Sequence, residues 1–219
     1  MFIDHLSSNP HFYVYVVVTM VLSVVMHELA HGWAAIWQGD RTPIDLGHMT
    51  IDPRVHMGAL SLLMLVFCGI CYGAMPVNPR RFRSRYGHAW VSLAGPLMNL
   101  MLALLALTGL AAWRLAAHAV TLQNTTNSNL QEFLWVFGYC NIALCVFNLI
   151  PIPPLDGSSI LANLNKGYAR LIERVRDPRV NMFALLVVIT VISSDEVNIY
   201  RLGGWVAGHY LQWLYALAA

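Results

Sequence analysis

Apolar runs long enough to cross a lipid bilayer constrain this chain more than any other feature of its sequence. Three long runs cover approximately residues 12–37, 89–117 and 133–152. An α-helix rises about 1.5 Å per residue, so about 20 residues cross a hydrocarbon core of roughly 30 Å. Only 11% of the residues are charged, compared with about 25% in soluble domains. We therefore expect an all-α polytopic membrane protein with a core of about three transmembrane helices.

Shorter apolar segments accompany this core. Residues 57–75 form a short run that Gly69 and Gly73 interrupt, and glycine favours bends, so we expect a re-entrant segment there. The stretches at 182–192 and 199–219 predict C-terminal apolar helices. Because no low-complexity linker or internal repeat divides the chain, we expect one membrane domain over residues 1–219, with a core at 12–157 and a C-terminal helical region at 158–219.

Positive charge predicts the orientation of these helices. Four arginines between Arg80 and Arg85 precede the run at 89–117, and a basic, interfacial helix is expected from Asp156 to about Arg179. Loops rich in Lys and Arg stay in the cytoplasm. Both clusters are therefore expected there, with the Asn/Thr-rich loop at 123–129 outside. The run at 57–75 must then enter and leave the membrane by the same face.

The first run carries the sequence His27-Glu28-Leu29-Ala30-His31 in its second half, toward the predicted cytoplasmic side. Residues four apart lie on the same helix face, so His27 and His31 can offer two imidazole nitrogens to one metal ion. Glu28 is displaced around the helix but is close enough to reach a water at that metal. This is the arrangement that a zinc hydrolase needs.

A catalytic zinc site usually has three protein ligands, so a third ligand is expected from another helix. Asp156 is the best candidate, because it follows the inner end of the run at 133–152, on the same predicted side as the histidines. Two other interpretations stay open. Each histidine alone could be a hydrogen-bonded core residue, and Asp156 could be the N-cap of the helix that follows the prolines.

The four cysteines carry a weaker signal. Cys68 and Cys71 have C-x-x-C spacing, but no second pair follows at zinc-ribbon spacing. We expect all four cysteines, Cys140 and Cys145 included, to be small buried apolar residues.

Several motifs together resemble the site-2 protease family of intramembrane zinc metalloproteases, peptidase family M50. They are the HELAH helix, the GPLMN stretch at 95–99 and the NLIPIPPLDG stretch at 148–157. The stretches at 46–53 and 76–82 also resemble its small bacterial and archaeal members, which lack a PDZ domain. The resemblance spans roughly residues 27–157, whereas the C-terminal third resembles the family only in its hydrophobicity. The resemblance implies a bacterial or archaeal cell membrane. Larger members of the family have a PDZ domain and a helix before the HExxH helix, and we expect this chain to depart from them in both respects.

The resemblance also implies roles for the matched residues. His27, His31 and Asp156 would bind one zinc ion per chain, and Glu28 would be the general base that accepts a proton from water. Asn148 would be a second catalytic residue that holds the substrate or the developing oxyanion. A hydrogen bond between helices is the alternative for this amide.

Three further positions have structural interpretations. Gly95 would permit close helix approach, and Asn99 would bond across helices. His56 lies where small members of the family carry a histidine, and we expect a polar contact near the interface.

The function predicted from these observations is intramembrane zinc endopeptidase activity on peptide bonds in or near transmembrane helices. Its partners would be transmembrane protein substrates and the lipid bilayer, and no basic, aromatic-interleaved surface suggests nucleic acid. A membrane zinc-binding or metal-transport protein is the alternative, since intramembrane His and Asp also serve ion pathways. A catalytically inactive relative that only binds membrane helices is a third reading, which the intact His27, Glu28, His31 and Asp156 disfavour.

Overall fold

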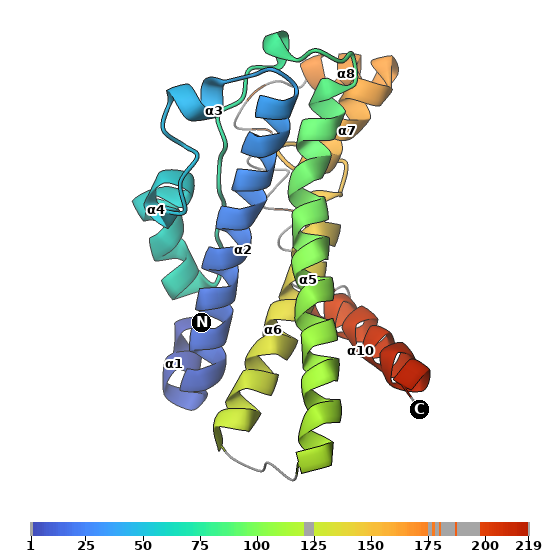
Figure 1. Ribbon diagram of the computed structural model, residues 1–219. Coiled ribbons are helices and arrows are strands. Elements are labelled where there is room, and N and C mark those ends of the chain that lie inside the picture. The colour runs from blue at the N-terminus through green and yellow to red at the C-terminus, as the bar shows by residue number, and fades with distance from the viewer. Residues whose placement is uncertain are drawn as a thin grey trace.

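Three long apolar helices form the body of the protein in the computed structural model. The structure describes residues 2–120, 125–174 and 198–218, and the single residues 177, 180 and 187; for residues 117–120 and 125–127 it describes the backbone only. Helices α2 (Pro10–Trp37), α5 (Gly87–Val120) and α6 (Thr125–Asn148) lie side by side (Figure 1). Each contains a stretch that is long and apolar enough to cross a membrane. The prediction of an all-α polytopic membrane protein is confirmed.

Local sequence signals explain where these helices begin and end. The Asn9 side chain accepts a hydrogen bond from the Phe12 N–H at 3.1 Å and caps α2, with Pro10 in the first turn. Helix α6 ends at Asn148, earlier than the expected residue 152, because the prolines that follow cannot continue a helix. Residues 125–129, which were expected in a loop, belong to α6. Residues 123 and 124 of that expected loop lie outside the described residues.

Two apolar clusters hold the helices together. In the first, α2 packs on α6 and on the short helix α4 (Pro53–Cys68) through Val16, Met20, Val24, Met57, Leu65, Val136 and Cys140. In the second, α5 and α6 pack on α10 (Ile199–Ala218) through Ala103, Leu107, Leu110, Ala111, Ile142, Ala207 and Leu211. Outside the lipid, burial of apolar surface of this kind is the main contribution that stabilises contacts between helices. Within the lipid, close van der Waals packing between the helices takes that role.

The segment from α4 to α5 enters and leaves the bundle at the same end, as predicted for a re-entrant segment. Helix α4 ends at Gly69, whose φ of +73° suits a left-handed C-cap. Residues 70–78 then return in an extended conformation alongside α2 (Figure 1). The Ser61 hydroxyl donates to the Tyr72 carbonyl at 2.7 Å and accepts from the Tyr72 N–H at 2.8 Å. The Ala74 N–H donates to the His56 carbonyl at 3.0 Å, which completes the hairpin.

A buried carboxylate fixes the loop that follows α2. Asp40 is fully buried and accepts hydrogen bonds from the Thr42 N–H at 3.0 Å, the Thr42 hydroxyl at 2.5 Å and the Asn78 N–H at 2.6 Å. Burial alone would raise the pKa of Asp40, but these hydrogen bonds outweigh it and lower that pKa. The carboxylate thus joins α3 (Thr42–Asp45) to the end of the extended segment, just before the short helix η2 (Pro79–Arg81).

The C-terminal third differs from the expectation in one respect. The single interfacial helix expected from Asp156 to about Arg179 is two helices in the described residues, α7 (Asp156–Leu164) and α8 (Lys166–Arg174). Asn165 separates them, because its side chain caps α8 by accepting from the Gly167 N–H at 2.8 Å and the Tyr168 N–H at 3.1 Å. The predicted apolar stretch at 182–192 lies outside the described residues, except for residue 187.

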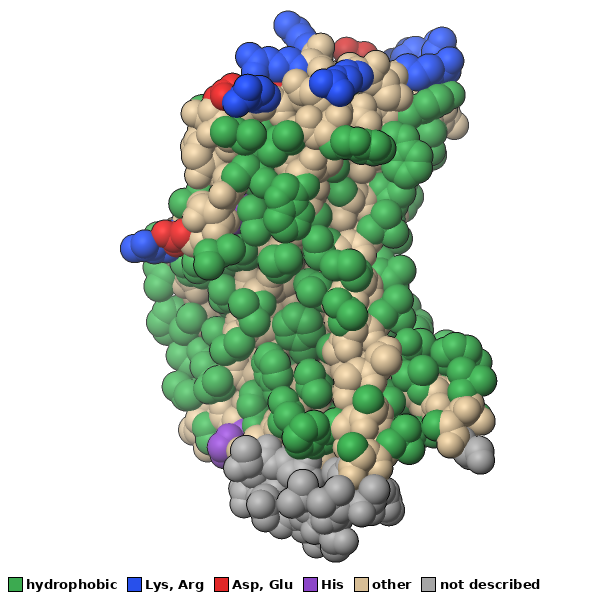
Figure 2. All heavy atoms as spheres, viewed as in Figure 1, with side chains coloured by type: hydrophobic (Ala, Val, Ile, Leu, Met, Phe, Trp, Pro, Cys, Tyr) green, Lys and Arg blue, Asp and Glu red, His purple; other side chains and the backbone are tan. Residues whose placement is uncertain are grey.

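The two ends of the bundle differ in charge. Lys and Arg side chains gather mainly at the end where α3, α7 and α8 lie (Figures 1 and 2), which we call the basic end. The N-terminal elements η1 (Phe2–Asp4) and α1 (His5–Ser8) lie farther down the bundle (Figure 1). A broad apolar surface separates the basic end from the opposite end (Figure 2), as integral membrane proteins require.

Candidate metal centre

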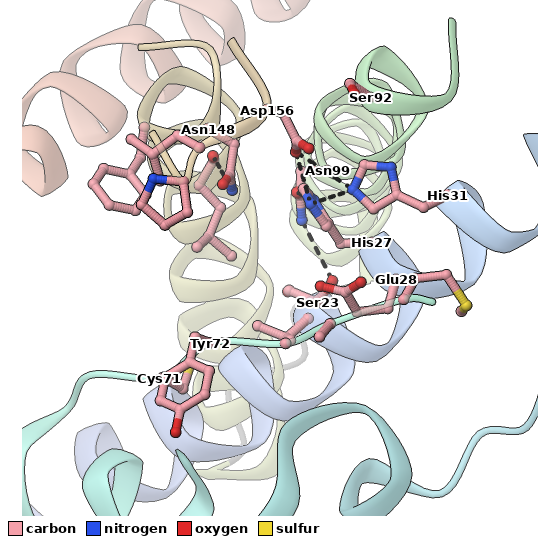
Figure 3. A pocket seen from close by; sticks show the side chains of 18 of the residues that line it. Ser23, His27, Glu28, His31, Cys71, Tyr72, Ser92, Asn99, Asn148 and Asp156 are labelled. Carbon is pink, nitrogen blue, oxygen red and sulfur yellow. Dashed lines mark hydrogen bonds and ion pairs between the residues drawn. The ribbon is translucent and has the colours of Figure 1, made fainter. Parts of the chain in front are cut away.

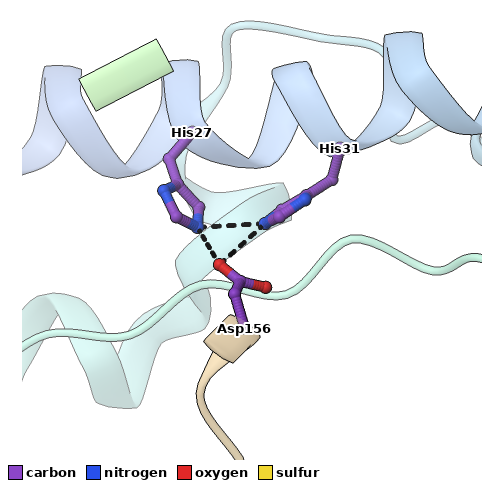
Figure 4. Close-up of side chains that lie close together, drawn as sticks. All are labelled: His27, His31 and Asp156. Carbon is purple, nitrogen blue, oxygen red and sulfur yellow. Dashed lines mark hydrogen bonds and ion pairs between the residues drawn. The ribbon is translucent and has the colours of Figure 1, made fainter. Parts of the chain in front are cut away.

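Three side chains from two helices converge near the basic end. His27 Nε2 lies 3.0 Å from His31 Nε2, and Asp156 Oδ2 lies 3.1 Å from the first nitrogen and 3.4 Å from the second (Figure 4). Both histidines are buried, and the aspartate is mostly buried. The sequence analysis named these three residues as candidate ligands, and the structure brings them together as a group that could hold one metal ion.

The fold places the two kinds of ligand in different ways. The histidines are four residues apart on α2 and therefore share one face of that helix. Asp156 is the first residue of α7, and Leu155, not Asp156, is the N-cap. The alternative in which Asp156 caps that helix is thus excluded. Gly157 lies against the carbonyl groups of Leu149 and Ile150, where a Cβ atom would have no room, so the chain can fold back onto the end of α6.

A buried hydrogen-bond network determines which nitrogen of His27 carries the proton. Asn141 Nδ2 donates to the Phe137 carbonyl at 2.9 Å, so Asn141 Oδ1 must face Asn99, which donates to it at 2.9 Å. Asn99 Oδ1 is then left to face His27 Nδ1 at 2.6 Å. An amide oxygen can only accept, so His27 Nδ1 carries the proton.

The same reasoning applies to His31. Its Nδ1 lies 2.7 Å from the Val91 carbonyl oxygen, which can only accept, so Nδ1 carries the proton there too. In the neutral imidazoles, the form that binds a metal, both Nε2 atoms therefore present lone pairs toward each other and toward the Asp156 carboxylate. Asp156 Oδ2 is buried and receives no hydrogen bond from the described residues.

Three acceptor atoms packed this closely repel one another unless a cation lies among them. Two imidazoles and one carboxylate, each imidazole held by a partner at its other nitrogen, are a donor set typical of catalytic zinc sites. The residues present therefore fit a zinc ion, with His27, His31 and Asp156 as the side chains that would hold it.

The amide network behind His27 contains two residues that the sequence analysis missed. Asn141 donates to the Ser23 hydroxyl at 2.8 Å, and Ser23, Asn99 and Asn141 are all fully buried. Asn99 joins α5 to α2 and α6, which confirms the expected bond across helices. The available sequence signal was the spacing of Asn141 and Asn148, which are seven residues apart on one helix face.

Gly95 allows α5 to approach the histidines. A Cβ atom at this position would lie 2.5 Å from Nε2 of both His27 and His31. The expected role of Gly95 in close helix approach is thus confirmed, and the approach takes place directly beside the candidate ligands.

Glu28 faces a cavity of about 620 Å³ that the three converging side chains border. Its carboxylate receives no hydrogen bond from the described residues, so it is able to accept one from a water or a substrate. Gly73 of the extended segment passes over it, and a Cβ atom there would lie 2.6 Å from Glu28 Oε1. The walls of the cavity come from α2, α4, α5, α6, α7 and residues 70–77.

Asn148 lies across this cavity from Glu28 (Figure 3). One of its amide hydrogens is donated to the Leu144 carbonyl of its own helix at 3.0 Å. The described contacts include no bond from Asn148 to another helix, so they do not support the helix–helix alternative. Its second amide hydrogen is available to a group in the cavity.

His56 and the four cysteines are the remaining residues whose environment was predicted from the sequence. His56 is buried, and its Nε2 lies 2.6 Å from the Thr50 carbonyl oxygen, a polar contact of the expected kind. Cys140 and Cys145 are buried as expected, but Cys68 is exposed, because it lies at the end of α4 and faces away from the bundle's core clusters. Cys71 lines the cavity.

Comparisons with known proteins agree with this geometry. The family model of peptidase family M50 matches residues 15–115 and 114–192. YwhC of Bacillus subtilis, named as an inferred zinc metalloprotease, is 34% identical over 152 residues, which cover 68% of this chain and 68% of YwhC. Rip2 of Mycobacterium tuberculosis, named in the same way, is 29% identical over 223 residues, covering 94% of this chain and 74% of Rip2. No solved structure matches the chain significantly.

Asn99→Leu tests the amide network behind His27. Without the Asn99 oxygen, His27 loses the partner that fixes its tautomer and ring orientation, so zinc affinity is expected to fall about 10- to 100-fold. Zinc retention against a competing chelator measures the change. Asn141→Leu, one hydrogen bond farther away, should give a smaller loss, and wild-type zinc affinity in Asn99→Leu would contradict the assignment.

Gly95→Ala tests the close approach of α5. The added methyl group would strike both Nε2 atoms, so the variant is expected to lose zinc while its helices remain folded. Gly109→Ala is the matched control, because it lies on the same helix with open space around it. Zinc content per chain and helical circular dichroism are measured together. A full zinc complement in both variants would contradict the close approach of α5 to His27 and His31.

Proposed function

The chain belongs to peptidase family M50 and is a zinc metalloendopeptidase, and from this premise we propose that it hydrolyses peptide bonds in or near transmembrane helices of membrane proteins. The observation that carries the proposal is the position of His27 and His31 in α2, a helix that can span a membrane, with Asp156 beside them in the turn that follows the spanning helix α6. Family membership favours this activity over the zinc-binding or metal-transport alternative.

Each side chain of the site has a chemical task in this proposal. His27, His31 and Asp156 would hold the zinc ion, which when bound would supply Lewis-acid chemistry to the scissile carbonyl and to the attacking water. Glu28, whose carboxylate faces the cavity without a partner, accepts the proton of the attacking water and passes it to the leaving nitrogen. Asn148 donates its second amide hydrogen to the oxygen on which negative charge develops.

The extended segment offers a surface for the substrate backbone. In an extended chain, successive N–H groups point to opposite sides. The N–H groups of Tyr72 and Ala74 point toward α4, where Ser61 and the His56 carbonyl accept them. Those of Gly73 and Met75 consequently point to the other side, where Gly73 lies against Glu28. A substrate strand could pair with this edge by backbone hydrogen bonds.

The substrate must therefore be extended at the cleavage site. A transmembrane helix uses its carbonyl groups in internal hydrogen bonds, so a helical substrate has to unwind locally before attack. Residues that weaken a helix near the cleavage site are expected to favour hydrolysis. Apolar side chains that line the cavity, Leu60, Met64, Leu144 and Phe147 among them, suit an apolar substrate.

We also infer that the basic end faces the cytoplasm of a bacterial or archaeal cell. The arginines before α5 and the basic residues of α8 support this orientation through the positive-inside rule. Exposed aromatic side chains lie at the end of α2 (Trp33 and Trp37) and around the start of α5 (Tyr86 and Trp90), where an aromatic belt is expected at a membrane interface. Water for hydrolysis would then enter from the cytoplasm.

Glu28→Gln tests the proteolytic function. Co-expression with a panel of single-span membrane proteins is expected to reveal fragments with the wild-type chain. Loss of the general base should slow their formation by roughly 10²- to 10⁴-fold. The amide is nearly isosteric with the carboxylate, so the variant should keep one zinc ion per chain. Equal cleavage by both chains would defeat the mechanism, and a loss of zinc in the variant would move Glu28 into the ligand set.

The orientation is tested with single cysteines in a chain that has no other cysteine. Arg83→Cys, near the basic end, should react with a membrane-impermeant thiol reagent only when the cytoplasmic side is accessible. His11→Cys, exposed at the start of α2, should react only from the opposite side. The reverse pattern would overturn the proposed orientation without affecting the assignment of the site.

A further inference from the structure

Helix α8 carries a stripe of basic side chains that the proposed hydrolysis does not use. Lys166, Arg170 and Arg174 are four residues apart in turn and therefore lie on one face of the helix. All three are exposed, and none of them forms an ion pair with a carboxylate of the described residues. Glu173 is the one acidic residue of α8, and it borders this face beside Lys166. We propose that this stripe binds the headgroup of an anionic phospholipid and thereby holds the turn that carries Asp156.

The remaining surface of α8 is that of a helix that lies in a membrane interface. Tyr168 and Ile172 occupy the opposite face, Ala169 lies at its edge, and all three side chains are partly buried. Leu171 lies between this face and the stripe and is 57% exposed, and Leu164 at the end of α7 is 60% exposed. Exposed leucines beside a basic stripe are the pattern by which amphipathic helices enter the boundary between headgroups and acyl chains. A helix that faced only water would gain nothing from these leucines.

The neighbouring elements place α8 at that boundary. Asn163 of α7 donates to the Arg85 carbonyl at 3.2 Å, which ties the end of α7 to the loop before α5. Tyr86 and Trp90 follow directly and are exposed. Since such aromatic side chains mark the interface level, α8 begins at the same depth. Its cationic stripe then lies where the phosphate groups of one leaflet lie, and clusters of Lys and Arg in this position attract anionic lipids.

One side chain links α8 to the candidate metal centre. The Tyr168 hydroxyl donates to the Pro151 carbonyl at 2.7 Å, and because its one proton is used there, the Ser158 hydroxyl donates to it at 3.0 Å. Pro151 precedes Asp156 in the turn after α6, and Ser158 follows Asp156 in α7. Tyr168 therefore clamps both sides of the turn that presents the aspartate. A headgroup that fixes α8 would fix this turn through Tyr168.

Lipid retention by the purified full-length chain tests the binding site. Native mass spectrometry in detergent is expected to show that the wild type retains phosphatidylglycerol and loses phosphatidylcholine with the same acyl chains. Replacement of all three basic residues (Lys166→Gln, Arg170→Gln, Arg174→Gln) should weaken retention of the anionic lipid on the order of fivefold per residue. Equal retention of the two lipids by the wild type would overturn the proposal.

A matched charge variant distinguishes a site from general attraction. Arg41→Gln, Arg54→Gln and Arg80→Gln together remove the same charge from exposed positions outside α8, and retention should remain near the wild-type level. An equal loss in both triple variants would show that net charge alone decides binding. Displacement of the lipid by millimolar inorganic phosphate would show that the stripe takes a free anion, and would also contradict the proposal.

Tyr168→Phe tests the link to the site, and this arm rests on the proposed proteolytic function. In vesicles, wild-type cleavage should be faster with phosphatidylglycerol than with phosphatidylcholine alone. Tyr168→Phe should keep lipid retention but lose that difference, whereas Tyr86→Phe, whose hydroxyl makes no hydrogen bond to the described residues, should keep both. A lipid effect that survives in Tyr168→Phe would overturn the link. Absence of cleavage in every vesicle would count against the proposed function, and lipid retention would still decide the binding site.

Discussion

When both imidazoles are neutral, two of their nitrogens and one carboxylate oxygen lie 3.0–3.4 Å apart with no proton among them, and the rest of the structure depends on this arrangement. Such a cluster is repulsive in an apolar bundle unless a cation compensates it. Residues around the cluster orient the imidazoles. Asn99 Oδ1 and the Val91 carbonyl accept hydrogen bonds from Nδ1 of His27 and His31, so these protons lie on the nitrogens that face away from the cluster. The bundle is thus organised to leave three lone pairs for one metal ion.

The helices can approach this closely because polar groups are satisfied where they are buried. Unpaired amides are costly away from water, yet Asn99, Asn141 and Ser23 form a connected chain with partners at each step. Gly95 supplies the space that a side chain would otherwise fill. The re-entrant segment closes the other side of the cavity and brings its backbone to Glu28. The same interior therefore provides metal ligands, a base and a surface for an extended peptide.

The sequence predicted the parts of this structure that follow from periodicity and spacing. Apolar run lengths identified α2, α5 and α6, and the spacing of His27 and His31 placed both on one helix face. Asp156 was assigned from its position after the inner end of the run at 133–152, but its place as the first residue of α7 depends on how the Pro-rich turn folds. Asn141 and Ser23 were missed because a buried amide in an apolar run acquires its partner only from tertiary packing. The break at Asn165 was missed because its capping bonds are local and compete with helix continuation.

X-ray absorption spectroscopy of the zinc-loaded protein tests the central claim most directly. With His27, His31 and Asp156 as ligands, the spectrum should contain two imidazole rings and only nitrogen or oxygen atoms in the first shell, at about 2.0–2.2 Å. A sulfur atom at about 2.3 Å would contradict the account, since it would place a cysteine such as Cys71, which lines the same cavity, at the metal in place of the aspartate.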